Sequence, residues 1–347
     1  MVKYTIQRLI LAFVTAVIIL TLTYFLMKQL PFQIPVGGTE VQFAYFQKEL
    51  SLGNVVRFTK ETEGYGDLLI KLTSNTDRKT TYYYYKAPAY IGYFNWVGSI
   101  LTEGNWGTSV SVMQNVDAMV IIMERLPTTI KVNIWPTIIS VPAGIALGVW
   151  AALKKNKLTD HIISTLVMIF ISVPSFIVIT FLMLLLCFNF KVFPTQWPKA
   201  DDPIDVKILG YFIPTMALSF GSICGYCRSV RAELTEVMSS DFLLLARTKG
   251  LTRSQAIVRH AMKNAMVPIL PSILAEVIGL LFGAMILEQI YGIPGVGQLY
   301  IKSINAKDYN VLMADMALYT LIGLVSGVFL DLSYSLIDPR IRMGARK

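Results

Sequence analysis

Long apolar runs alternate with short polar segments along most of the chain, and this pattern predicts membrane-spanning helices. A helix needs roughly 20 predominantly apolar residues to cross about 30 Å of hydrocarbon. Six runs meet that length: residues 9–27, 128–153, 162–188, 208–226, 266–290 and 313–337. The first run is followed by Lys28-Gln29-Leu30-Pro31 and not by the small residues of a cleavage site. We therefore interpret it as a retained anchor and not as a signal peptide.

The composition excludes the two main alternatives to a membrane protein. Hydrophobic residues make up 54% of the 347 residues and charged residues only 15%, against roughly 45–50% and about 25% in soluble domains. Disorder needs the reverse balance, and a soluble enzyme of this length could not bury so much apolar surface. Three cysteines give no disulfide framework. The expected class is an all-α integral membrane protein.

The distribution of Lys and Arg predicts the orientation. If both termini are cytoplasmic, the short inner segments hold sixteen Lys and Arg residues, and the short outer loops hold five. Such an excess is typical of the cytoplasmic side. The outer five are Lys191, Lys199, Lys207, Lys302 and Lys307. The same rule accounts for the net charge of +9, so we expect no nucleic-acid partner.

The segment between the first two spans is too long for a simple loop, and strand-like runs predict a small β-rich subdomain outside the membrane. The runs are residues 55–59, 67–72 and 80–85, with Gly64-Tyr65-Gly66 as a turn between the first two. The last run contains four consecutive tyrosines. They could form a binding surface or lie on the membrane interface, where Tyr is enriched.

This pattern divides the chain into an anchor, an outer segment, a membrane core and a tail. The predicted parts are residues 1–30, 31–125, 126–337 and 338–347, with a cytoplasmic region at 228–263 inside the core.

The cytoplasmic region reads as a short helix, a glycine turn and a second helix. Residues 242–249 have helical composition, and Asp241 can cap their start. Gly250 suits the position after the helix, where φ is positive. Thr252 and Gln255 have capping-box spacing, so a second helix begins there and could run until Pro268.

One face of the predicted short helix is apolar. Phe242, Leu245 and Ala246 lie on the same side of it. The pattern alone leaves two interpretations open: the face packs on the chain's own bundle, or it docks on another protein.

The remaining candidate groups do not favour an enzyme. The sequence contains no Gly-x4-Gly-Lys-Ser/Thr phosphate loop, no nucleophile–base pair in the spans and no metal cluster. The Cys-x-x-Cys formed by Cys224 and Cys227 is expected to supply small packing thiols. Glu276, near the middle of the fifth span, is expected either to line a pathway or to bond between helices. Pro174 and two further span prolines could kink their helices. A self-sufficient carrier would show internal repeats, and we find no convincing one.

Several motifs together resemble the oligopeptide/dipeptide branch of ABC importer permeases, in its B-type subunit. The resemblance covers the first helix and residues 93–347, whereas residues 40–90 are longer than the family's usual spacer. The general importer motif reads Glu-Ala-Ala-x3-Gly, and this chain matches it at Ala246 and Gly250. The motifs that carry the resemblance are Glu124-Arg125-Leu126-Pro127-Thr128-Thr129, Ala246-Arg247-Thr248-Lys249-Gly250-Leu251, Arg259-His260-Ala261, Asn264-Ala265, Glu288 with Gly292-Ile293-Pro294-Gly295-Val296-Gly297, and Asp331, Tyr334 and Asp338-Pro339-Arg340-Ile341-Arg342.

The resemblance implies a type I importer fold in a bacterial plasma membrane. It implies a second, C-type permease subunit, two ABC ATPase subunits that bind ATP and Mg²⁺, and an extracytoplasmic binding protein that delivers oligopeptides. Dipeptides, nickel and sugars are the alternative substrates of this branch. The short cytoplasmic helix would sit in an ATPase groove through Asp241, Phe242, Leu245, Ala246, Arg247, Lys249 and Gly250.

Overall fold

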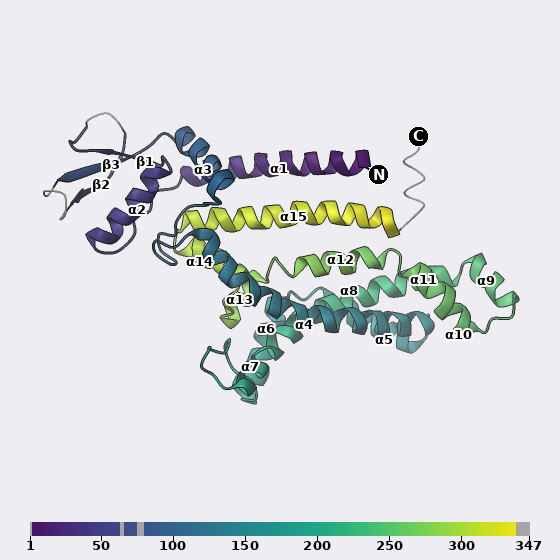
Figure 1. Cartoon of the computed structure of the whole chain (residues 1–347). Coiled ribbons are helices and arrows are strands. Elements are labelled where there is room, and N and C mark those ends of the chain that lie inside the picture. The colour runs from purple at the N-terminus through teal and green to yellow at the C-terminus, as the bar shows by residue number, and fades with distance from the viewer. Residues whose placement is uncertain (1, 63–65, 75–79, 338–347) are drawn as a thin grey trace. The chain divides into compact units, whose positions relative to one another are not determined.

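The computed structural model describes residues 2–62, 66–74 and 80–337, and the chain divides into two compact units. The first unit comprises Met1–Pro127 with Val296–Leu324, and the second comprises Thr128–Gly295 with Val325–Lys347. Two long helices, α4 (Ala118–Leu153) and α15 (Tyr309–Ile337), contribute to both units (Figure 1).

The remaining elements are helical except for one small sheet. The first unit holds α1 (Val2–Lys28), α2 (Thr39–Ser51), β1 (Val55–Phe58), β2 (Leu68–Thr73), β3 (Thr81–Lys86), α3 (Ala89–Glu103) and α14 (Val296–Asn305). The second holds α5 (Leu158–Ile171), α6 (Ser175–Leu182), the π-helical η1 (Met183–Asn189), α7 (Ile204–Gly210), α8 (Phe212–Met238), α9 (Asp241–Thr248), α10 (Arg253–Ala256), η2 (Ile257–Ala261), α11 (Met262–Ala265), α12 (Ile269–Gly279) and α13 (Met285–Tyr291).

Among the described residues, four helices are long and apolar enough to cross a membrane. They are Tyr4–Lys28, Ala118–Leu153, Ile204–Met238 and Tyr309–Ser333. Two bent helix pairs raise the number to six if each pair is one span: Leu158–Ile171 with Ser175–Asn189, bent by 96°, and Arg253–Ala265 with Ile269–Gly279, bent by 57°. The predicted first, second and sixth spans each coincide with one long helix.

The third and fifth predicted spans are each interrupted within the membrane-spanning run. The third breaks between α5 and α6, where Pro174 lacks a backbone N–H and disfavours helical geometry at Val173. The fifth stops at Gly279 and resumes at Met285, and Gly283 in the gap adopts a φ of +68°. The fourth span was predicted to end at Tyr226, but α8 continues for twelve more residues, to Met238. The first basic residues of the predicted cytoplasmic region therefore lie on this helix.

Two glycines let α4 approach the backbone of α8. A Cβ added at Gly144 would lie 2.5 Å from the Tyr226 Cβ, and one at Gly148 would lie 2.7 Å from the Cys227 carbonyl oxygen. Small residues four apart allow such close approach of membrane helices. Cys224 and Cys227 are buried free thiols at this packing surface, which agrees with the predicted packing role.

The sheet of the first unit confirms the three predicted strands. Its order is β1-β3-β2 and both pairings are antiparallel, so β1 and β2 are not neighbours. Most of the predicted turn at residues 64–66 lies outside the described residues. The helix α2, which the sequence analysis did not predict, packs on one face of the sheet.

The tyrosine run is mostly enclosed by the subdomain and does not form a wholly exposed binding surface. Tyr84 is fully buried and its ring lies 4.7 Å from that of Phe46 on α2, while Tyr85 is 3% exposed. Tyr82 and Tyr83 are half-buried on the two faces of β3. Because β3 is the central strand, its tyrosines supply the core of this subdomain.

Buried polar contacts fasten the subdomain to the start of α15. The Asp308 Oδ2 accepts hydrogen bonds from the Ser109 hydroxyl (2.6 Å) and from the backbone N–H groups of Val110, Ser111 and Val112 (2.9–3.0 Å). Asp308 itself is fully buried. One carboxylate therefore holds a loop that lies almost two hundred residues away in the sequence.

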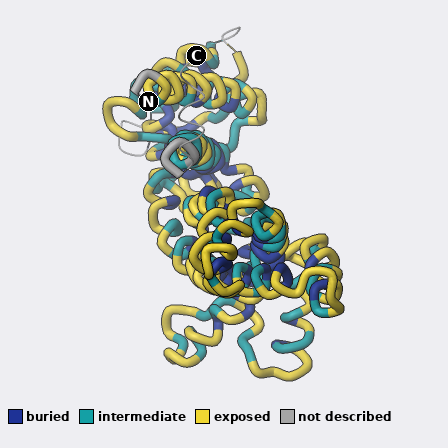
Figure 2. Tube along the Cα trace, turned by 90° about the vertical axis from the view of Figure 1, so that its right-hand side faces the viewer, coloured by how far each residue is buried: buried dark blue, intermediate teal, exposed yellow. Residues whose placement is uncertain are grey.

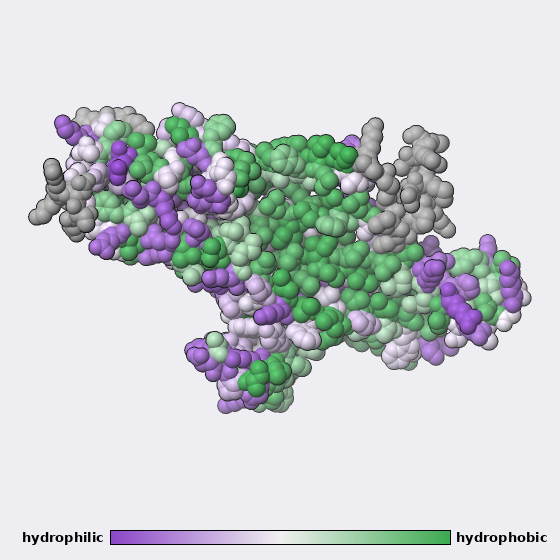
Figure 3. Space-filling model, in the orientation of Figure 1, coloured by the Kyte–Doolittle hydropathy of each residue, from purple (hydrophilic) through white to green (hydrophobic). Residues whose placement is uncertain are grey.

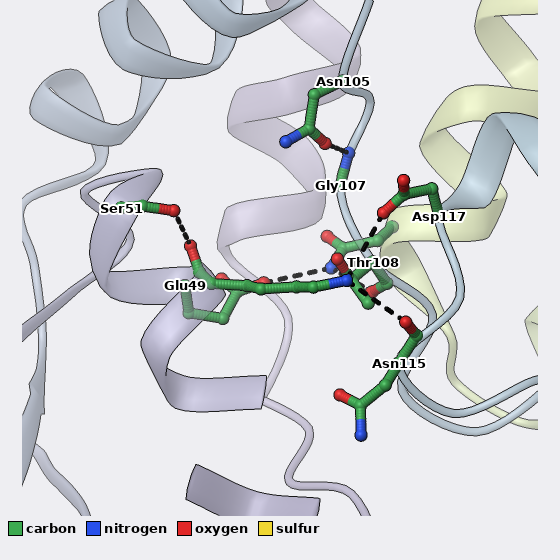
Figure 4. A network of polar contacts seen from close by, with 9 residues as sticks. Glu49, Ser51, Asn105, Gly107, Thr108, Asn115 and Asp117 are labelled. Carbon is green, nitrogen blue, oxygen red and sulfur yellow. Dashed lines mark hydrogen bonds and ion pairs between the residues drawn. The ribbon is translucent and has the colours of Figure 1, made fainter. Parts of the chain in front are cut away.

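A second set of contacts joins α2 to the same loop (Figure 4). The Lys48 ammonium donates to the Asn115 carbonyl (3.2 Å) and pairs with Asp117 (3.5 Å). The Asn310 amide donates to the buried Glu49 carboxylate (3.3 Å) and to the Thr108 carbonyl (2.8 Å). These bonds fix α2, the loop and α15 as one body.

The surface of each unit has an apolar part and a polar part (Figure 3). On the first unit, apolar side chains cover α1, where Phe13 is 70% exposed, and polar ones gather over the sheet and α2. On the second unit, polar side chains gather around α9 and α10. Buried residues lie where helices pack together, and the outward faces are exposed (Figure 2). Exposed apolar helices of this kind suit a lipid environment.

Candidate functional site

The candidate site is the helix–turn–helix that follows α8 in the second unit. Ser239 and Ser240 follow α8 and lead into α9, whose N-cap is Ser240. The predicted cap, Asp241, is instead the first helical residue, so that expectation is wrong. Its carboxylate lies in the first turn, where the helix dipole favours negative charge.

The turn after α9 has the predicted geometry. Gly250 adopts a φ of +94°, and no atom lies within 4 Å of an added Cβ. The glycine is therefore needed for its backbone conformation and not for close packing. Thr252 and Gln255 form the predicted capping box, with bonds of 3.3 and 3.1 Å, at the start of α10. The helix then continues through η2 and α11 to Ala265.

The helix α9 has one buried apolar side chain and several exposed ones. Leu243 is 5% exposed and packs among small residues and branched aliphatic side chains of α4, α8, α10 and η2. In contrast, Phe242 is 42% exposed, Leu244 61% and Leu245 57%. The predicted face is therefore not packed on the chain's own bundle at Phe242 and Leu245. Leu243 packs on the chain's own bundle, whereas the described residues leave the exposed group, Phe242, Leu244 and Leu245, uncovered. The docking role of this group stays a prediction.

Basic side chains surround a cleft beside α9. The cleft has a volume of about 490 Å³ and includes the side of α9 that carries Asp241, Leu244 and Arg247. Its cationic lining residues are Lys155, Lys157, Arg247 and Arg253. Lys249 is also exposed, at the end of α9. The exposed apolar group is thus bordered by positive charge, which a partner with an acidic rim would complement.

A buried ion pair, which the sequence analysis missed, holds the base of this site. The Asp160 carboxylate on α5 is fully buried and accepts two bonds from the Arg231 guanidinium on α8, of 2.5 and 2.8 Å. It also accepts the Asn156 N–H (2.9 Å) and the Ser164 hydroxyl (3.2 Å). Asn156 has a φ of +63°, so Asp160 fixes the sharp turn between α4 and α5. We call these contacts the Asp160 clamp.

Glu276 lies on α12 and makes a contact to another helix. Its Oε1 accepts a hydrogen bond from the Ser140 hydroxyl on α4 (3.0 Å), and the residue is half-buried. One of its two expected roles, bonding between helices, is therefore present. A role in lining the pathway stays a prediction.

The glycine-rich motif after α13 forms a tight turn against Glu288. This glutamate is 1% exposed, and an added Cβ at Gly295 would lie 2.4 Å from its Oε2. Gly292 ends α13 with a φ of +73°. The two glycines therefore serve different needs, namely close approach at Gly295 and a left-handed backbone at Gly292.

Comparison with known proteins identifies the class of protein. Residues 144–343 match the family model of the binding-protein-dependent transport system inner membrane component. This match includes α9, the glycine turn and the clamp residues. The chain belongs to this family, whose members are permease components of ABC importers and not catalytic enzymes.

The similar proteins are peptide permeases. The chain is 34% identical to the dipeptide transport system permease protein DppB of Lactococcus lactis, over 99% of this chain and 100% of that protein. It is 30% identical to DppB of Bacillus subtilis, over 99% of both. It is 26% identical to the oligopeptide permease OppB of Haemophilus influenzae, over 92% of this chain and 99% of that protein. The first two matches extend across residues 40–90, so that segment is not confined to this chain.

The Asp160 clamp generates a stability prediction. Asp160→Asn should destabilise the protein by about 2–4 kcal/mol, because it removes one partner of a buried ion pair while Arg231 keeps some access to water. Arg231→Gln should act in the same direction, and the double variant should cost less than the two single variants together. The midpoint of thermal unfolding of the purified permease complex measures the loss of stability in each variant. Lys157→Gln, an exposed neighbour, should leave the midpoint unchanged, and an equal effect of both substitutions would contradict the clamp.

Proposed function

We propose that this chain is the permease subunit of an ATP-driven importer that moves short peptides across a bacterial cell membrane. The exposed apolar group on α9 is the observation that carries the proposal. This group consists of Phe242, Leu244 and Leu245 and lies beside a basic cleft. Its helix packs against the rest of the second unit through Leu243. Family membership supplies the transport class, and the names of the relatives suggest peptides as the cargo.

The proposed assembly contains a second, homologous permease chain, two ABC ATPases and an extracytoplasmic peptide-binding protein. The ATPases would bind ATP and Mg²⁺, because this sequence contains no phosphate loop. Their docking would cover the exposed group of α9, with Asp241, Ala246, Arg247, Lys249 and Gly250 around it. Movement of the ATPases would then reach the membrane helices through α9 and α8.

The peptide length is the finer part of the proposal. The resemblance in the sequence predicted oligopeptides, whereas the two relatives that match over the full chain are named dipeptide permeases. We therefore propose that short peptides, dipeptides included, are the cargo. Selection by length would fall mainly to the binding protein.

The proposed orientation places both termini and α9 in the cytoplasm, with the sheet outside. Its support is the sixteen-to-five distribution of basic residues. A cysteine at the exposed position Glu61 should react with a membrane-impermeant thiol reagent in intact cells, and one at Ser254 should react only after permeabilisation. Labelling of Ser254→Cys in unbroken cells would reverse the assignment.

Uptake measurements test the cargo. In a strain without other peptide importers, the complete importer should accumulate labelled dipeptides and tripeptides in an ATP-dependent manner. A non-hydrolysing variant of the partner ATPase is the control for passive entry. Accumulation of nickel or a sugar without any peptide would reject peptides as the cargo.

The helix α9 generates a coupling prediction. Leu245→Glu should lower ATPase binding at least tenfold, because burying an unpaired carboxylate costs several kcal/mol. The matched control is Val258→Glu, since Val258 is 67% exposed but lies on η2. Leu243→Ala should instead lower thermal stability by about 2–4 kcal/mol, because it opens a cavity. The measurements are co-purification of the ATPases and peptide-stimulated ATP hydrolysis. Normal values for Leu245→Glu would exclude this group as the docking surface.

A further inference from the structure

A pocket at the opposite end of α8 from α9 gathers three lysines. It is formed within the second unit by the part of α4 around Thr128 and Lys131, the segment between η1 and α7, α7 with Tyr211, and the turn after α13. Its volume is about 830 Å³. We call it the outer lysine pocket, and its lining residues are Thr128, Lys131, Gln196, Trp197, Pro198, Lys199, Ala200, Lys207, Tyr211, Gly292 and Pro294.

The positive charge of this pocket is not neutralised by ion pairs. Within the described ranges, Lys131, Lys199 and Lys207 make no ion pair, and no acidic side chain lines the pocket. The Lys207 ammonium donates to the Ala200 carbonyl (2.5 Å). The nearby Asp202 carboxylate accepts the Lys199 backbone N–H (2.7 Å). Three ammonium groups around one hollow create a positive potential that attracts anions.

The wall beside the lysines is aromatic and held in place. The rings of Trp197 and Tyr211 meet edge to face, with centroids 4.8 Å apart. The backbone N–H of Trp197 donates to the Tyr291 carbonyl (2.8 Å), and the Tyr291 hydroxyl donates to the Pro194 carbonyl (3.0 Å). Tyr291 is fully buried. A ligand with an anionic end and an apolar side chain would therefore match both parts of the pocket.

We propose that the outer lysine pocket receives the C-terminal carboxylate of the incoming peptide. The inference rests on the proposed peptide cargo and on the proposed orientation, which places the pocket outside the membrane. Peptides of different sequence share a terminal carboxylate, so a cationic pocket recognises them without selecting side chains. The aromatic wall would contact the last side chain. Lys131, Lys199 and Lys207 would attract and position the peptide at the entrance.

Charge-selective labelling at Ala200 tests the positive electrostatic potential of the pocket without relying on transport. Ala200 is exposed and lines the pocket, so Ala200→Cys retains all three lysines, and the native cysteines are buried. In right-side-out vesicles carrying the importer complex, an anionic and a cationic methanethiosulfonate reagent are compared. The reference is a cysteine at exposed Asn305. Relative to this reference, the anionic reagent should be favoured about threefold to tenfold at Ala200.

Replacing the three lysines by glutamine should return that preference to the reference value. The matched control is Lys191→Gln, an exposed lysine in the same segment that does not line the pocket; it should leave the preference unchanged. No preference at Ala200, or a preference that survives loss of the three lysines, would overturn the proposal.

Protection by peptides then tests the ligand. With binding protein washed away, a millimolar dipeptide with a free carboxylate should slow labelling of Ala200→Cys at least twofold more than its C-terminal amide. Equal protection by the acid and the amide, or protection only by an anionic lipid, would overturn the carboxylate assignment. If peptides are not the cargo, a different pattern is expected. The importer would take up no peptide and neither peptide would slow labelling, while the preference for the anionic reagent would remain.

Discussion

Hydrocarbon offers no hydrogen-bond partner to the backbone, and this constraint governs the structure. The long helices satisfy their own N–H and C=O groups, and where a helix stops, another group must supply the missing contacts. At the turn between α4 and α5 the Asp160 carboxylate takes the Asn156 N–H and the Arg231 guanidinium. Before α15, Asp308 takes three backbone N–H groups from one loop. Both carboxylates are fully buried, and each accepts several hydrogen bonds, those of Asp308 all through its Oδ2.

The presence of the main apolar helices and the positions of the strands were predictable, because both depend on local periodicity. The glycine turn and the capping box were predictable for the same reason, since Gly250, Thr252 and Gln255 act over a few residues. The spacing placed Phe242 and Leu245 on an apolar face of α9, but the division of the apolar side chains into buried Leu243 and exposed Leu245 was not predictable. That division depends on where α4 and α10 lie.

The contacts that sequence reasoning missed join residues far apart in the chain. Asp160 and Arg231 are separated by 71 residues, and Ser109 and Asp308 by 199. Nothing in a local pattern pairs them. Tyr84 was misjudged for a related reason: a run of tyrosines does not reveal that its strand is central, because strand order depends on pairing. The breaks of the third and fifth spans were only partly predictable, since Pro174 was noticed but its 96° bend needs tertiary packing.

The second unit gives the proposed coupling a physical route. The helix α8 has 27 residues, which corresponds to about 40 Å of continuous helix. Tyr211 of the outer lysine pocket precedes its first residue, and α9 follows its last by two serines. Near the α9 end, Arg231 ties α8 to α5 and Leu234 packs against Leu243. A continuous helix transmits displacement along its axis with little loss. In the proposed mechanism, movement imposed on α9 would therefore reach the Tyr211 wall along this one helix.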